Sequence, residues 1–160
     1  SILTEISVES REKEKFAHYY NRFVAHAQGQ RFAEEQCCVN VKANDYYSAS
    51  GKFDIDFLFT ANDCLVQCRR VLKYSYCYIY HITNEIQDID SVQLALFEDH
   101  LERLERFTEN LSEATEGALA PVDRKRVIDL TLITRRCLKT MNELGYELQV
   151  KPLTKLVNME

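Results

Sequence analysis

The chain has 160 residues, of which 46% are hydrophobic and 28% are charged, and its formal net charge is −5. This length and composition suit one folded domain with a core of its own, and the acidic balance gives no sign of a nucleic-acid or membrane partner. Four glycines and two prolines are too few for an all-β protein with many tight turns. The composition therefore favours a few long helices.

The first predicted helix opens near residues 7–10 and continues past Phe32 towards Tyr46. Its apolar positions recur at helical spacing, at Phe16, Tyr20, Phe23 and Ala27. The small and polar residues 48–52 predict a break. A second helix follows, for which Asp54 or Asp56 is a candidate cap. Its apolar seam comprises Leu58, Ala61, Leu65, Cys68 and Leu72.

Four tyrosines alternate at the end of this second helix, at 74, 76, 78 and 80. Taken alone, their period of two indicates a β-strand, but a strand without a partner strand is not stable. On a helix, Tyr74 and Tyr78 share one side, and Tyr76 and Tyr80 share nearly the opposite side. We therefore predict the buried end of a helix, covered on both sides by its neighbours.

The third predicted helix has the most regular seam and ends at Glu116 and Gly117. The fourth helix begins near Pro121 and is closed by Gly145, and residues 151–160 form a short tail. We predict an all-α fold, an elongated antiparallel bundle of about four long helices, with residues 1–150 as a single domain. The two seams comprise Leu94, Phe97, Leu101, Leu104, Thr108 and Leu111, and Val127, Leu130, Thr134, Cys137, Met141 and Leu144.

Cysteine usage and the lack of targeting signals bear on location. The six cysteines form no Cys-x-x-Cys pair, and most lie in apolar helical patterns. No apolar run approaches the roughly 18 residues of a membrane-spanning helix, and no signal-peptide pattern opens the chain. We expect reduced thiols in a core, and a cytoplasmic or nuclear protein.

No constellation of catalytic residues is found. The Glu-x-x-His pairs of a di-metal bundle are missing, and the four histidines form no cluster at metal-ligand spacing. Cys64 and Cys68 share a helix face and could bind zinc together, but no other residue supplies the remaining ligands. A phosphate-binding glycine loop and a nucleophile elbow are also missing. We expect neither catalytic residues nor a metal or other cofactor in this chain.

Two side chains leave a choice between a structural and an interacting role. Phe32 lies among polar residues and outside the seam of the first helix. Either the helix curves so that Phe32 joins the core, or its ring anchors a partner. Glu109 is either a solvated carboxylate or a hydrogen-bond acceptor and charge partner for something docked on the bundle.

Three stretches resemble one family. Residues 16–26, followed by Gln28, Arg31 and Phe32, are similar to the first helix of the Ariadne domain, the C-terminal helical part of Ariadne-type RING-between-RING (RBR) E3 ubiquitin ligases. Residues 67–80 resemble the hallmark Cys-Arg-x-x-Leu-x-(Tyr/Trp)-(Ser/Thr)-Tyr. A third likeness, to the third helix of the family, runs from residues 97–98 to 104–109. The resemblance covers roughly residues 12–145.

The resemblance implies a regulatory role. In this family the Ariadne domain folds over the catalytic RING2 (Rcat) domain and shields its active cysteine, until a partner such as a neddylated cullin–RING ligase releases it. Ubiquitin then passes from an E2 enzyme to that cysteine and on to a lysine. The zinc-binding RING1, IBR and RING2 modules lie outside this chain. The resemblance therefore implies that zinc, E2 binding and transferase activity belong to the parent protein, and that this chain binds and restrains.

The family's restraining surface uses a Phe-Glu pair on the first helix and a glutamate on the third. Residue by residue, these positions fall on Phe32, Ala33 and Glu109, so the middle glutamate is missing. Glu34 or Glu35 could substitute, although a one-residue step turns a side chain by about 100°. From the hallmark run, Arg69, Tyr74, Tyr76 and Tyr78 are expected to be structural. The alternative function is a helical scaffold or oligomerisation adaptor that pairs through the seam of the third helix.

Overall fold

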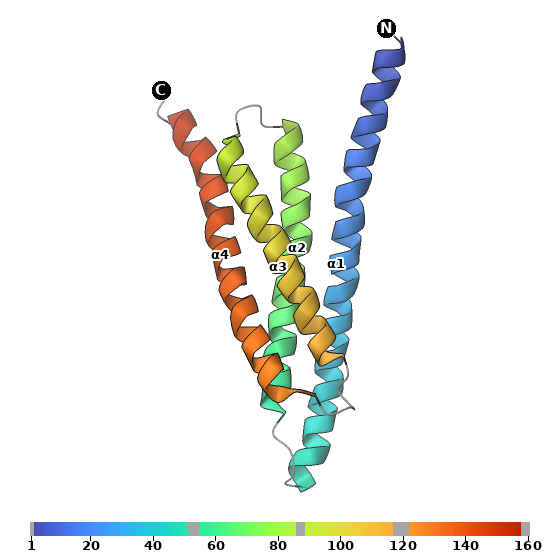
Figure 1. The fold of residues 1–160 in the computed structure, drawn as a ribbon, viewed down its shortest axis with the longest axis vertical. Coiled ribbons are helices and arrows are strands. Elements are labelled where there is room, and N and C mark those ends of the chain that lie inside the picture. Colours follow the sequence, from blue (N-terminus) through green and yellow to red (C-terminus); the bar gives the residue numbers. More distant parts are fainter. Residues whose placement is uncertain (1, 51–54, 86–88, 117–121, 158–160) are drawn as a thin grey trace.

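The computed structural model describes residues 2–50, 55–85, 89–116 and 122–157. Within these ranges the chain forms four α-helices: α1 (Ile2–Ser50), α2 (Asp56–Glu85), α3 (Ser91–Thr115) and α4 (Arg124–Val157). The helices run alternately up and down along the long axis of the molecule (Figure 1). The prediction of an all-α antiparallel bundle is confirmed.

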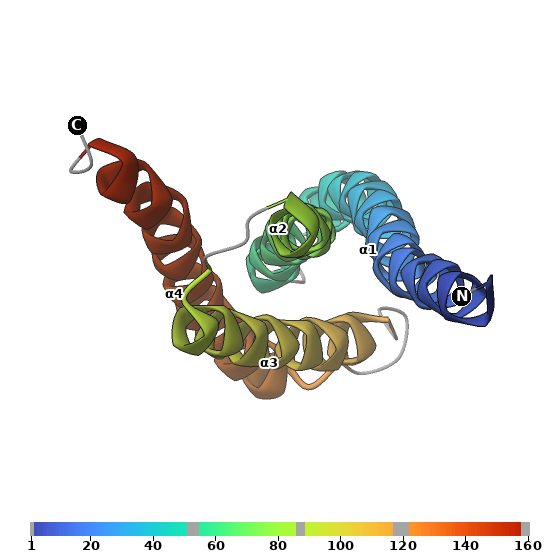
Figure 2. The same cartoon turned by 90° about the horizontal axis from the view of Figure 1, so that it is seen from above.

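Helix α2 is the centre of the bundle. It packs against α1, α3 and α4, and α3 also packs against α4. Seen along the helices, α1 and α4 lie on different sides of α2, and α3 closes a third side (Figure 2). Helix α2 is therefore the element that contacts all three of the others.

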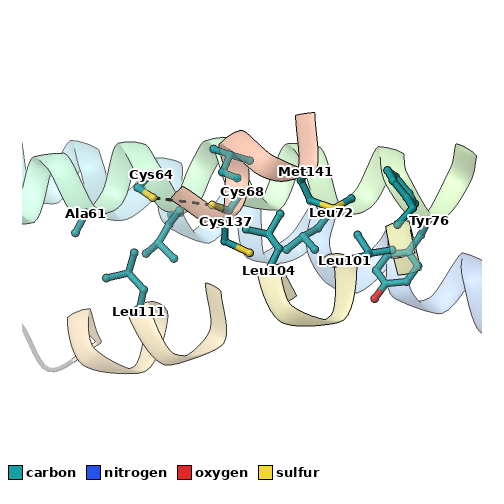
Figure 3. Close-up of a cluster of buried hydrophobic side chains, with 14 of the residues drawn as sticks. Ala61, Cys64, Cys68, Leu72, Tyr76, Leu101, Leu104, Leu111, Cys137 and Met141 are labelled. Carbon is teal, nitrogen blue, oxygen red and sulfur yellow. Dashed lines mark hydrogen bonds between the residues drawn. The ribbon is translucent and has the colours of Figure 1, made fainter. Parts of the chain in front are cut away.

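The core follows the predicted seams of α2, α3 and α4. All five predicted seam residues of α2 are buried, and the buried stripe continues through Tyr76 and Ile79. These side chains meet Leu101, Leu104 and Leu111 of α3 and residues of α4 (Figure 3). The tyrosine run is therefore helical, as predicted.

The start of α3 is fixed by Asp90, whose side chain accepts hydrogen bonds from the backbone N–H groups of Val92 and Gln93 at 3.0 and 3.3 Å. Such a cap satisfies donors that have no partner inside a helix. The backbone N–H of Glu116 donates to the carbonyl of Ser112 at the other end. The predicted end of this helix at Glu116 is confirmed.

The predicted end of α4 at Gly145 is wrong, because the helix continues to Val157. A glycine usually weakens a helix, but Leu148, beyond it, is buried in the core. Burial of Leu148 stabilises a further helical turn and outweighs the low helix propensity of Gly145. Residues 151–157, expected to form a tail, belong to the helix. The predicted start at Pro121 lies outside the described residues. At the start of α4, the side chain of Asp123 accepts a hydrogen bond from the backbone N–H of Arg126 at 3.1 Å.

Helix α1 begins earlier than predicted, and its predicted apolar seam is only partly covered, because Phe23 and Ala27 are half-buried. Phe16 and Tyr20 are exposed, whereas His26 and Ala33 are buried. The inward face is thus partly polar, which an apolar pattern cannot reveal. The first turns of α1 extend beyond the nearby end of α2 (Figure 1) and carry exposed Ile2.

All six cysteines are free thiols. Cys64, Cys68 and Cys137 are buried, whereas Cys38 and Cys77 are exposed. The prediction that the cysteines lie in the core is therefore confirmed for three of the six. None of the described helices combines the length and the apolar character that crossing a bilayer requires.

Candidate protein-interaction site

A polar cluster joins α1 to α3 across α2. The backbones of α1 and α3 do not pack directly among the described residues, so long side chains bridge them. Two come from each helix: Arg22 and His26, Arg69 and Tyr76, and Glu105 and Glu109.

Glu105 is the acceptor at one end of the cluster. Its Oε2 accepts from the Tyr76 hydroxyl at 2.7 Å and from Nη1 of Arg22 at 2.9 Å, and its Oε1 lies 2.9 Å from Nε2 of His26. Burial alone would raise the pKa of Glu105. The hydrogen bonds from His26 and Tyr76, together with electrostatic attraction to His26 and Arg22, outweigh burial and lower this pKa to about 2.

His26 links the two ends of the cluster in one defined tautomer. Nη1 of Arg69 lies 3.1 Å from its Nδ1, and because a guanidinium can only donate, Nδ1 must accept. The ring proton therefore sits on Nε2, which donates to Glu105. The imidazole also stacks on the Tyr76 ring, with 5.7 Å between centroids and 4° between planes.

Glu109 is held at the other end by Arg69. The two terminal nitrogens of Arg69 donate to the two carboxylate oxygens, from Nη2 at 3.1 Å. The guanidinium is buried, whereas the Glu109 side chain is 56% exposed. The arrangement thus places a neutralised carboxylate at the surface, with its counter-charge beneath it.

Phe32 lies at the mouth of a narrow cleft next to this pair. The cleft is formed by α1, α2 and α3, and its lining includes Arg69, Leu65 and Thr115. Phe32 is 46% exposed, so its ring partly covers the core and partly faces solvent. Arg69 therefore links the two residues, because it lines the cleft that Phe32 borders and also holds Glu109.

The two remaining residues of the predicted surface do not join this pair. Ala33 is 4% exposed and belongs to the core against α2. Glu34 is exposed, and its Oε1 accepts from Gln30 Nε2 at 2.9 Å. Two residues correspond to about 200° around a helix, so Glu34 lies on the opposite side of α1 from Phe32. Glu35, three residues after Phe32, is exposed and lies on the same side of α1 as that ring.

The hallmark tyrosines divide between the core and the surface. Tyr76 is buried, and hydrogen bonding to Glu105 adds to burial in raising its pKa. Tyr78 is half-buried and meets the Phe97 ring edge-on, with 6.4 Å between centroids. Tyr74 is 57% exposed beside Lys73, whose Nζ lies 4.9 Å from its ring centroid. The prediction that both tyrosine stripes are covered is therefore wrong for Tyr74.

Sequence reasoning missed Arg22, His26 and Glu105 as parts of one cluster. The spacing of Arg22 and His26, one helical turn apart, was the available signal. No group of three or more potential metal ligands occurs in the described part of the chain. The site thus presents a half-exposed ring and a neutralised carboxylate to solvent.

The sequence is similar to one known family along most of its length. The pattern that defines this family, described as the Ariadne domain, matches residues 14–147. The E3 ubiquitin-protein ligase dbl4 of Schizosaccharomyces pombe is 32% identical over 129 residues, which are 76% of this chain and 24% of that protein. The E3 ubiquitin-protein ligase ariadne-1 of Drosophila melanogaster is 31% identical over 143 residues, or 83% of this chain and 27% of that protein.

A third relative, the probable E3 ubiquitin-protein ligase rbrA of Dictyostelium discoideum, is 31% identical over 141 residues, or 79% of this chain and 26% of that protein. The chain thus spans about a quarter of the length of these relatives. No solved structure matches the chain significantly.

Proposed function

The chain belongs to the Ariadne domain family, and from this premise we propose that it is the autoinhibitory and partner-docking domain of an RBR E3 ubiquitin ligase. In this proposal the surface around Phe32 and Glu109 covers the catalytic cysteine of the RING2 (Rcat) domain in the parent protein. A docked partner, such as a neddylated cullin–RING ligase, uncovers that cysteine. The E2 enzyme, ubiquitin and zinc are handled by the parent's other modules, and this chain itself has no transferase activity.

The observation that carries this proposal is that Arg69 links a half-exposed apolar ring to a fixed acceptor. Phe32 borders the cleft that Arg69 lines, and Arg69 holds Glu109. Both side chains rise from a bundle whose core fixes their helices. A partner that covers the cleft can therefore bury the ring and donate to the carboxylate without any rearrangement of this domain.

The energy available from Phe32 is modest. Full burial of a phenylalanine side chain stabilises by roughly 1.5–3 kcal/mol, and about half of the ring's surface is already covered. A partner therefore gains about 1 kcal/mol from Phe32, which corresponds to roughly a fivefold change in an equilibrium constant. A restraint of this size is readily reversed by a competing partner.

The family's restraining surface has a glutamate on the first helix, and Ala33 stands at that position in this chain. Because Ala33 is buried and Glu34 faces the other side of α1, we assign that part of the surface to Glu35. Glu35 is exposed on the same side of the helix as Phe32. It would meet a basic or hydrogen-bond-donating group of RING2 at the edge of the contact.

The proposal is tested by ubiquitin discharge from the full-length ligase. Phe32→Ala should discharge roughly fivefold faster than wild type, because about 1 kcal/mol of restraint is lost. Tyr146→Ala is the matched control, since Tyr146 is an exposed aromatic residue on α4. Unchanged discharge in both Phe32→Ala and Glu35→Ala would contradict the restraint.

The alternative of an oligomerisation scaffold rests on the seam of α3. Five of its six residues are buried in the bundle, and Leu94 is half-buried. The apolar seam that suggested a dimer is therefore already buried by the other helices of the same chain. Sedimentation of the domain separates the two functions, because the restraint proposal expects a monomer.

A further inference from the structure

Gly29 of α1 passes directly over the Arg69 side chain. A Cβ atom at this position would lie 2.7 Å from Nε and 2.9 Å from Cζ of Arg69. Both distances are shorter than real contacts of a Cβ atom, so either Arg69 or the helix would have to move. The Arg69 guanidinium thus occupies the space that a side chain at position 29 would fill.

Arg69 has no free direction in which to move. Its Nη1 donates to both Glu109 and His26, and its Nη2 donates to Glu109. His26 is in turn held between Glu105 and the Tyr76 ring. A side chain at Gly29 would therefore displace the guanidinium and break its bonds to Glu109.

This fixed pair determines what Glu109 offers to a partner. Each carboxylate oxygen already accepts one bond from Arg69, and each keeps a second acceptor position. The exposed part of the side chain makes those positions reachable. A cation approaching there would also meet the positive charge of Arg69 a few ångströms away, so attraction and repulsion would largely cancel.

From these contacts we propose that Arg69, for which Gly29 leaves room, is a positioning residue that presents Glu109 as a charge-neutralised acceptor, and that the partner meets Glu109 with an uncharged N–H or O–H donor. This inference rests on the proposed function, since it specifies the partner chemistry of the same surface. Backbone amides, hydroxyls and carboxamides fit it, and lysine or arginine do not. Glu113, one turn further along α3, is exposed and has no ion-pair partner among the described residues, so a cation would favour it instead.

The positioning claim is tested in this chain by Gly29→Ala, with Gly145→Ala as the control. A Cβ atom at Gly145 would lie 3.6 Å from the Phe97 ring, an ordinary contact. Alanine is the better helix former, so Gly145→Ala should melt higher than wild type. Gly29→Ala should melt lower, and the NMR signals of the hindered Arg69 terminal nitrogens should be lost only in this variant. Retained signals and a higher melting temperature in Gly29→Ala would overturn the claim.

The donor claim is tested by ubiquitin discharge from the full-length ligase. Glu109→Ala and Gly29→Ala should each accelerate discharge by the same factor, and the double variant should be no faster than either. For an uncharged donor, the ratio of Glu109→Ala to wild type should stay constant as salt is raised. A ratio that falls towards one would indicate a screened cation and overturn the inference.

The two experiments fail separately. If Glu109→Ala does not accelerate discharge while Phe32→Ala does, the partner contact at Glu109 is wrong and the wider restraint stands. If neither variant is faster, the proposed function fails as well. The NMR measurement on Arg69 decides the positioning claim in every case, because it needs no partner.

Discussion

At the scale of single residues, buried polar side chains join the helices beside the apolar core. His26 and Arg69 are buried, yet each finds partners on two other helices. Buried polar groups without such partners are costly. The same requirement fixes their geometry, because few arrangements satisfy every donor and acceptor at once. The cluster therefore sets the position of α1 relative to α3.

The low pKa of Glu105 makes the stability of the bundle depend on pH. Its folded value of about 2 lies below the ordinary value of 4.5, so the folded state favours the ionised carboxylate. This contribution is fully present above a pH of about 4.5 and is lost as the pH falls through about 2. It amounts to roughly 3–4 kcal/mol, at about 1.4 kcal/mol for each pH unit of pKa difference.

We therefore predict that Glu105→Gln destabilises the domain near neutral pH and flattens the loss of stability in acid. Urea unfolding of wild type and variant between neutral and acidic pH measures this, and the two stabilities should converge as Glu105 becomes protonated. Glu113→Gln is the control, since Glu113 is exposed on the same helix. A constant difference between wild type and Glu105→Gln at every pH would contradict the assignment.

At the scale of helices, α2, α3 and α4 were predictable because their buried faces consist mainly of apolar residues. Leu101, Leu104 and Leu111 recur in steps of three and four, and this spacing identifies one helix face. Helix α1 was not predictable in the same way. Its inward face carries Arg22 and His26, so its apolar residues indicated that face only in part. Gly145 failed as a stop signal because packing of the next turn outweighs local propensity.

The candidate site could be predicted only in part for the same physical reason. Phe32 and Glu109 stood out as an aromatic and a carboxylate in unusual settings, and the structure brings both beside Arg69. The burial of Ala33 and the outward turn of Glu34 depend on how α1 is rotated against α2. That rotation is set by Arg22, His26 and Glu105, whose contacts join residues far apart in the sequence.

The seam of α3 gives the prediction that belongs to this scale. Leu104 is fully buried where α2, α3 and α4 meet (Figure 3). Leu104→Ala should lower the free energy of unfolding by about 2–5 kcal/mol, because it removes apolar contacts and leaves a cavity. Leu132→Ala, at an exposed position of α4, should change it by less than about 0.5 kcal/mol. Equal effects in chemical denaturation would contradict the placement of α3.

At the scale of the whole molecule, the bundle is a long frame that holds one surface in place. Helix α2 supports the other three helices, and the cleft with Phe32 opens between α1 and α3. The chain matches about a quarter of the length of its relatives. A restraint supplied by such a frame acts on another part of the parent protein, which in our proposal is the RING2 cysteine.

In our proposal this domain covers the catalytic cysteine, so it should slow the rate at which a small alkylating reagent modifies that cysteine in the full-length ligase. We predict slow alkylation in wild type and in Tyr146→Ala, faster alkylation in Phe32→Ala, and the fastest when residues 1–160 are removed. Equal rates in the wild-type and the truncated ligase would contradict it.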